Sequence, residues 1–161
     1  MRLLIAAWTG VLMVAASAGV VAAVQPGGQF HAAPLEAEQE VQTPAVVSNA
    51  TGMAQFRLSD DGQSVEYRLN VANIDEVVVA HIHIGAPGSN GPPVVFLFGP
   101  VSPTDRVQGV LASGVFTAAE LVGPLAGQPL SALIDAMEAG NAYVNVHTSA
   151  YPNGEIRGQV D

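Results

Sequence analysis

The sequence contains no cysteine and no lysine. Without cysteine the fold has no disulfide staple, and neither a thiol nucleophile nor a lipid-modified cysteine is available. The five basic side chains are all arginines and face 14 acidic ones, which gives a formal net charge of −9. Because nucleic-acid binding depends on basic side chains that neutralise phosphates, we expect no nucleic-acid partner.

The sequence also lacks the short motifs of several enzyme classes. It has no G-x-S-x-G nucleophile turn and no glycine loop of the kind that cradles phosphates. Its carboxylates show no paired arrangement that would place two of them in one cleft. Any chemistry must therefore be sought in other residue types. Because no disulfide can form, stability must come from core packing and sheet pairing.

The N-terminus predicts a secretory signal. Arg2 precedes an apolar run, residues 3–24, that ends in small residues ahead of a Pro-Gly-Gly segment. We predict a signal peptide over residues 1–23, with cleavage after Ala23, and therefore a secreted or periplasmic protein. The alternative is an uncleaved membrane anchor, since the run is about long enough to span a bilayer.

The remainder has the size of one domain. Removal of the first 23 residues leaves 138 of the 161, and the loss of Arg2 takes the net charge from −9 to −10. Residues 24–35 are rich in Gly, Pro, Gln and Ala and predict a flexible linker, so His31 within it is given no role. The domain is expected over residues 36–161, with an exposed edge strand at residues 35–47.

Period-two alternation of apolar and polar residues predicts strands along most of the domain. Two short helical segments interrupt them: a capped turn at residues 117–121 and a helix at residues 131–139. Many short strands with turn signals between them indicate an all-β fold, a Greek-key sandwich or barrel with the helices in a crossover. The predicted strands span Thr51–Leu58, Ser64–Val71, Val77–Ile84, Val94–Phe98, Val107–Phe116, Ala142–Thr148 and Glu155–Val160.

Three of the four histidines fall in two of these strands, His81 and His83 in one and His147 in the other. Because side chains alternate along a strand, the apolar neighbours Ile82 and Val146 take the core face and leave the histidines on the outer face. A histidine pair at i and i+2 presents two nitrogens to one ion, and a third from a neighbouring strand completes a set suited to copper or zinc. We therefore predict a three-histidine metal site, provided that the two strands are neighbours.

The alternative is that the histidines are polar strand residues with no shared function. Two loops rich in Gly, Pro, Asn and Ser, residues 85–93 and 148–155, are predicted to wall the site. Asn145, Glu155 and Arg157 are expected on the outer face beside the histidines. We predict that they support the metal-binding side chains through hydrogen bonds.

Three stretches of the sequence together resemble the CHRD (chordin-type) domain. They are EAEQEV followed by TGMAQFRLSDDGQSVEYRLNV, then AHIHIGAPGSNGPPVVFLF, and finally FTAAELVGPLAGQPLSALIDAMEAGNAYVNVHTSAYPNGEIRGQV. The resemblance covers residues 36–161 and is to the single-copy, exported type found in bacteria and archaea. It implies an immunoglobulin-like β-barrel and an extracellular setting, and it implies no established activity.

The order of the histidines is also similar to that in Cu/Zn superoxide dismutase, a Greek-key barrel that holds copper outside its wall. His81, His83 and His147 match three of its positions in order, but the sequence has no bridging histidine, no further zinc ligands and no disulfide. Three functions stay open: a binding or structural module that holds a Cu or Zn ion, a copper-dependent redox enzyme, and a metal-free adhesion or matrix domain with a protein partner. A membrane contact is expected only through an uncleaved signal segment.

Overall fold

The computed structural model describes residues 28–161, so the predicted signal peptide lies outside the described residues. Eight strands, one α-helix and three single 3-10 turns make up this part of the chain. None of its helices combines the length and the hydropathy of a membrane span. The elements are β1 (Gln29–Glu36), η1 (Ala37–Gln39), β2 (Thr51–Leu58), β3 (Ser64–Ile74), β4 (Val77–Ile84), β5 (Pro93–Phe98), β6 (Val107–Thr117), η2 (Ala118–Glu120), η3 (Gly123–Leu125), α1 (Ser131–Glu138), β7 (Ala142–Thr148) and β8 (Ile156–Gln159).

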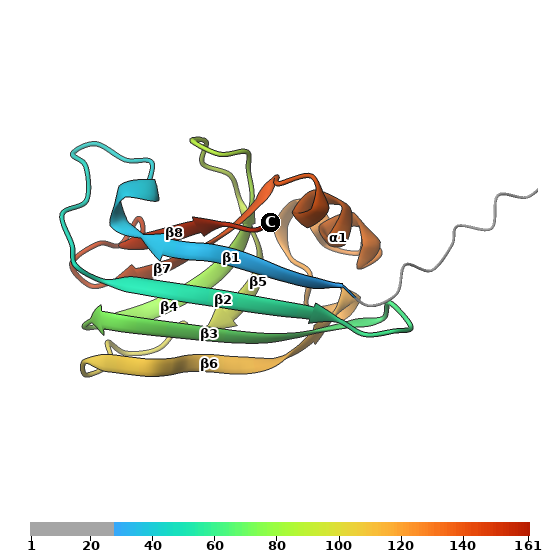
Figure 1. Cartoon of the computed structure of the whole chain (residues 1–161), viewed down its shortest axis with the longest axis horizontal. Helices are drawn as coiled ribbons and strands as arrows, with labels where there is room; N and C mark the ends of the chain where they lie inside the picture. Colours follow the sequence, from blue (N-terminus) through green and yellow to red (C-terminus); the bar gives the residue numbers. More distant parts are fainter. Residues whose placement is uncertain (1–27) are drawn as a thin grey trace, which may run out of the picture.

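The strands form one antiparallel sheet in the order β5-β4-β7-β8-β1-β2-β3-β6. The sheet curls until it is nearly a barrel, with β4 and β5 behind β2 and β3 in Figure 1. The Tyr67 hydroxyl of β3, the strand beside edge strand β6, donates to the Leu97 carbonyl of the opposite edge strand β5 at 2.8 Å. The all-β prediction is therefore confirmed, and β4 and β7 are neighbours as the three-histidine hypothesis requires.

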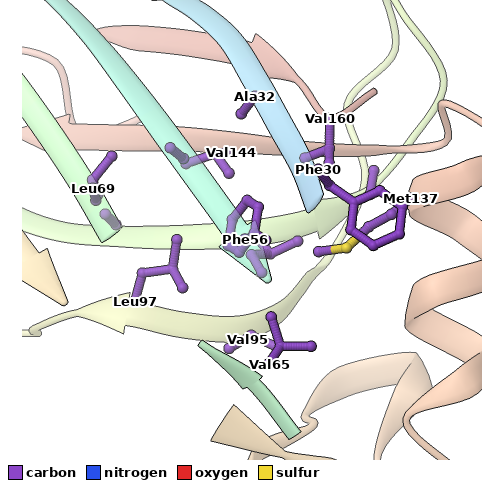
Figure 2. Packing of buried hydrophobic residues seen from close by; sticks show 14 of the residues in the cluster. Phe30, Ala32, Phe56, Val65, Leu69, Val95, Leu97, Met137, Val144 and Val160 are labelled. Atoms are coloured by element: carbon purple, nitrogen blue, oxygen red, sulfur yellow. The ribbon is translucent and has the colours of Figure 1, made fainter. Parts of the chain in front are cut away.

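The core fills the inside of this curled sheet. Alternate residues of the strands are buried there, as period-two patterning predicts, and Figure 2 shows side chains such as Phe56, Leu69 and Val144 packed together. One end is closed by α1, whose Met137 lies beside Phe30 and Val160. The helix packs here because its buried Leu133, Ile134 and Met137 share one side.

The linker predicted at residues 24–35 is wrong over its second half. From Gln29 the chain forms β1, which pairs with β2 along its length and meets β8 at its end. The composition is Gly- and Pro-rich, but Phe30, Ala32 and Leu35 are buried and supply the apolar face that a strand needs. A register shift between Ala32 and Leu35 accommodates Pro34, which cannot donate to the ladder.

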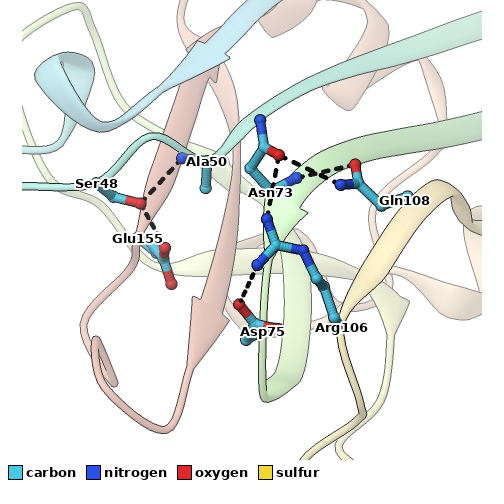
Figure 3. A network of polar contacts seen from close by, with 7 residues as sticks. All are labelled: Ser48, Ala50, Asn73, Asp75, Arg106, Gln108 and Glu155. Carbon is cyan, nitrogen blue, oxygen red and sulfur yellow. Dashed lines mark hydrogen bonds and ion pairs between the residues drawn. The ribbon is translucent and has the colours of Figure 1, made fainter.

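The edge strand predicted at residues 35–47 is also wrong. After η1, residues 40–50 form no regular structure and instead run across the outer face of the sheet, held by side-chain contacts. Ser48 Oγ donates to the Glu155 carboxylate at 2.6 Å and accepts from the Ala50 amide at 3.0 Å (Figure 3). Tyr151 donates its hydroxyl proton to the Val47 carbonyl at 2.8 Å. Of the alternating glutamates that suggested an exposed strand, Glu36 lies in β1, Glu38 in η1, and Glu40 at the start of residues 40–50, which we call the covering segment.

Figure 3 also shows how the end of β3 is tied to the start of β6. Asn73 adopts a φ of 56°, a left-handed conformation that Asn tolerates better than most residues. Its side-chain oxygen accepts from Arg106 and from Gln108 at 3.2 Å each. Arg106 also pairs with Asp75 at 3.1 Å, an exposed ion pair that adds little stability by itself.

Candidate metal centre

The three histidines come together on the outer face of β4 and β7. Antiparallel pairing sets His81 opposite Asn145 and Val79 opposite His147, so the three rings project from adjacent positions on one face. One nitrogen of each ring lies within 4.8 Å of one nitrogen of the other two. The predicted convergence is thus confirmed, since even this longest separation is close to what one ion could draw together.

Main-chain carbonyls fix how two of the rings are protonated. His83 Nδ1 lies 2.8 Å from the Gly91 carbonyl oxygen, and His147 Nδ1 lies 3.0 Å from that of Pro152. A carbonyl oxygen only accepts, so each Nδ1 carries the proton and donates it. In the neutral rings the lone pair is then on Nε2, which is the nitrogen that points into the cluster.

The ring of His81, also on β4, completes the cluster. His81 Nδ1 lies 3.2 Å from His147 Nε2, with the two rings nearly perpendicular. Phe96 of the edge strand β5 covers the other side of His81, with ring centroids 4.5 Å apart. Within the described residues, the Nε2 atom of His83 is buried without a hydrogen-bond partner. A lone pair left unpaired in a dry site is an expected feature of a cation ligand.

The histidines are less exposed than the sequence analysis expected. It placed them on the outer surface of the sheet, and the face is correct, but each of these residues is only 8–9% exposed. The difference arises because segments remote in sequence fold over the sheet. A cavity of about 270 Å³ remains between them and reaches two of the histidines; it is lined by Val41, Gln42, His83, Asn90, Gly91, Tyr143, Asn145, His147, Pro152 and Asn153.

Burial keeps the three rings neutral. Desolvation, together with the charges of the neighbouring imidazoles His147 and His83, lowers the pKa of His81 to about 4. Burial also lowers the pKa of His83 and of His147, while their carbonyl partners oppose the shift. A metal binds only the neutral imidazole, so the site is ready to bind a cation at neutral pH.

Of the three supporting residues predicted, Asn145 contacts a histidine directly: its Oδ1 lies 3.0 Å from His147 Nε2. Glu155 instead accepts from Thr148 at 2.7 Å as well as from Ser48, and so fastens the covering segment to β7. The sequence placed Glu155 on the correct face, but its hydrogen bonds in the described residues do not reach a histidine ring.

Arg157 supports the site indirectly, through the loop that contacts His83. Its guanidinium lies 3.4 Å above the Tyr143 ring and donates to the Ser89 carbonyl at 2.9 Å and to Asn90 Oδ1 at 3.2 Å. These contacts hold the loop that presents the Gly91 carbonyl to His83. The loop is held a second time by Tyr143, whose hydroxyl accepts from the Gly91 amide at 3.1 Å.

Sequence analysis did not identify Glu40, the first residue after η1. Burial raises the pKa of its carboxyl group to about 7, while the charge of Arg157 and the amide of Asn145 partly offset that increase. Glu40 Oε1 is buried without a hydrogen-bond partner among the described residues. No local signal marks this residue, because its position depends on how the covering segment crosses β7 and β8.

The family model for the CHRD domain matches residues 31–160. The chain therefore belongs to the CHRD domain family, in agreement with the resemblance noted from its motifs. Comparisons with curated proteins and with solved structures gave no match. The similarity to Cu/Zn superoxide dismutase remains a matter of three histidine positions.

Proposed function

We propose that this protein is an exported CHRD-domain module that binds one copper or zinc ion through His81, His83 and His147. The observation that carries the proposal is the convergence of the three ring nitrogens in a dry site, with two tautomers fixed so that lone pairs point inward. Imidazole nitrogen is a ligand common to copper and zinc, and three imidazoles leave a position free for a further donor.

Export and fold type belong to the same proposal. The apolar run at residues 3–24 supports secretion or a periplasmic location, and replacement of both Leu12 and Val14 by Asp should trap the precursor in the cytoplasm. The immunoglobulin-like Greek-key topology implied by the family is supported by sheet neighbours that are remote in sequence, such as β4 and β7 or β8 and β1.

The test is metal analysis of tag-free protein, followed by calorimetric titration with Zn²⁺ and with Cu²⁺. We expect one ion per chain, and we expect His81→Ala, His83→Ala or His147→Ala to weaken binding by more than the roughly 10- to 100-fold that outer partners contribute. His31→Ala is the matched control, because β1 pairs with β2 and β8 rather than with β4 or β7.

Two outcomes would decide against the proposal. Sub-stoichiometric metal in the tag-free protein, with no heat on titration, would leave a metal-free adhesion or matrix domain. Equal loss of affinity in the His31→Ala control would show that the metal binds nonspecifically to histidine. If copper binds, a superoxide turnover assay then separates a binding module from a redox enzyme.

A further inference from the structure

We propose that the side-chain oxygen of Asn145 is a fourth ligand of the three-histidine site, and that Glu40 is the positioning residue that aims this oxygen at the ion. The inference rests on the proposed metal-binding function and extends it to a set of three nitrogens and one oxygen.

Spacing supports Asn145 as a ligand. In a tetrahedral site with metal–ligand bonds of about 2.0–2.2 Å, neighbouring ligand atoms are about 3.3–3.6 Å apart. His147 Nε2 lies 3.2 Å from His81 Nδ1 and 3.0 Å from Asn145 Oδ1. The amide oxygen is thus spaced from His147 as the third ring nitrogen is, and the same amide lies against His83.

The donor and acceptor atoms at the site also support Asn145 as a ligand. Because His147 Nδ1 donates to the Pro152 carbonyl, the neutral ring presents a lone pair at Nε2. Asn145 Oδ1 presents lone pairs to that nitrogen at 3.0 Å, so two acceptors face each other. A cation that both atoms coordinate reconciles this contact, as it also satisfies the unpartnered Nε2 of His83.

A rotation of the Asn145 amide group by about 180° would point Nδ2 instead of Oδ1 at the histidines. Glu40 disfavours that orientation. Gly154 lies where β8 approaches this corner, and a Cβ atom built on it would overlap both Glu40 Oε1 and Asn145 Nδ2. The carboxylate and the amide nitrogen therefore share the space that the glycine leaves open. In its ionised form Glu40 accepts but does not donate, so Nδ2 turns toward Glu40 and Oδ1 toward the histidines.

The experiment measures affinity for Co²⁺ and Zn²⁺ in five proteins: wild type, Asn145→Leu, Asn145→Asp, Glu40→Gln and the double variant Asn145→Asp with Glu40→Gln. Leu keeps the shape of Asn without a donor atom, and Asp keeps an oxygen at the same place. The visible spectrum of bound Co²⁺ reports the ligand set independently of affinity, and circular dichroism confirms that each variant is folded.

We expect Asn145→Leu to weaken Co²⁺ binding at least about 10-fold and to change its spectrum, while Asn145→Asp binds at least as tightly as wild type. Glu40→Gln should weaken binding about 10- to 100-fold in the wild-type background, because the amide of Asn145 is then free to turn. In the Asn145→Asp background the same change should not weaken binding, since both atoms of the new side chain are oxygens.

Each contrary result has one meaning. If wild type binds no metal, the proposed function fails and the inference with it. If wild type binds but Asn145→Leu retains both affinity and spectrum, the fourth ligand is refuted while the three-histidine site stands. If Glu40→Gln weakens binding equally in both backgrounds, Glu40 acts through its charge alone, and its role in aiming the amide is refuted.

Discussion

Strands β4 and β7 bury side chains on both of their faces, but the two faces differ in chemistry. Inward, Ile82, Val144 and Val146 are fully buried among apolar neighbours. Outward, the histidines and Asn145 are nearly as dry, but polar and aromatic contacts join them. Burial by itself therefore does not distinguish a core from a site; the difference is whether buried polar atoms are paired or left open for a ligand.

The strongest test of this comparison removes one side chain from each face. Ile82→Ala should lower the free energy of unfolding by about 2–5 kcal/mol, because it leaves a cavity in the core. His83→Ala in the metal-free protein should cost about 0.5–1.5 kcal/mol, the contribution of the hydrogen bond from Nδ1 to the Gly91 carbonyl, because the ring lies outside that core and its Nε2 is unpaired. Urea unfolding measures both; equal losses would mean that the outer face is part of the stabilising core.

Metal should narrow the difference in stability cost between the two faces. With free Zn²⁺ at about 100 times its dissociation constant, wild type should gain about 2.7 kcal/mol in unfolding free energy. His83→Ala should gain almost nothing, whereas Ile82→Ala, although less stable, should gain as much as wild type. Thermal denaturation with and without Zn²⁺ checks this, and a full gain in His83→Ala would place the metal elsewhere.

Arg157 offers a test of the outer layer that does not involve metal. Arg157→Met should cost about 1.5–3 kcal/mol, since the Ser89 carbonyl and Asn90 lose a charged donor. Hydrogen exchange should show faster opening of residues 85–92 in this variant, with β2 and β3 unaffected. Uniform acceleration across the sheet would indicate that Arg157 stabilises the whole domain rather than the loop.

The smallest expected effect is a change in pH dependence. Glu40 has a folded pKa of about 7 against 4.5 unfolded, so its contribution to stability is lost as pH rises through that range. His81, at about 4 folded against 6.5 unfolded, has the opposite sign, and its contribution is lost as pH falls. Glu40→Gln should therefore make unfolding free energy rise more steeply between pH 4.5 and 6.5 than in the metal-free wild type. Parallel profiles from urea titrations would contradict this.

What the sequence could predict follows from the range of each signal. Strand alternation is local, so it placed Ile82 inward and His81 and His83 outward correctly, and the capping box at Thr117 is present as expected. The dryness of the site depends on residues 40–50, which reach the histidines only through tertiary folding. The spacing and periodicity of the sequence predict neither the position of residues 40–50 over the histidines nor that of Glu40.

The misreading of β1 has a similar cause. Its composition favours a linker, and only three apolar side chains, Phe30, Ala32 and Leu35, argue otherwise. Their burial is provided by β2 on one side and by the chain end around Val160 on the other. Where tertiary partners supply the stabilisation, local composition is a weak guide to secondary structure.

The separation of 66 positions between His81 and His147 sets the order of events during folding. When the chain is made from its N-terminus, His81 and His83 on β4 are present long before β7 exists. Strand β1 gains its second neighbour only when β8, the last strand, is added. Pairings this remote in sequence form slowly, after the cost of closing long loops has been met. The complete ligand set thus forms only in the fully folded domain, so tight metal binding by a molecule would indicate that this molecule has completed folding.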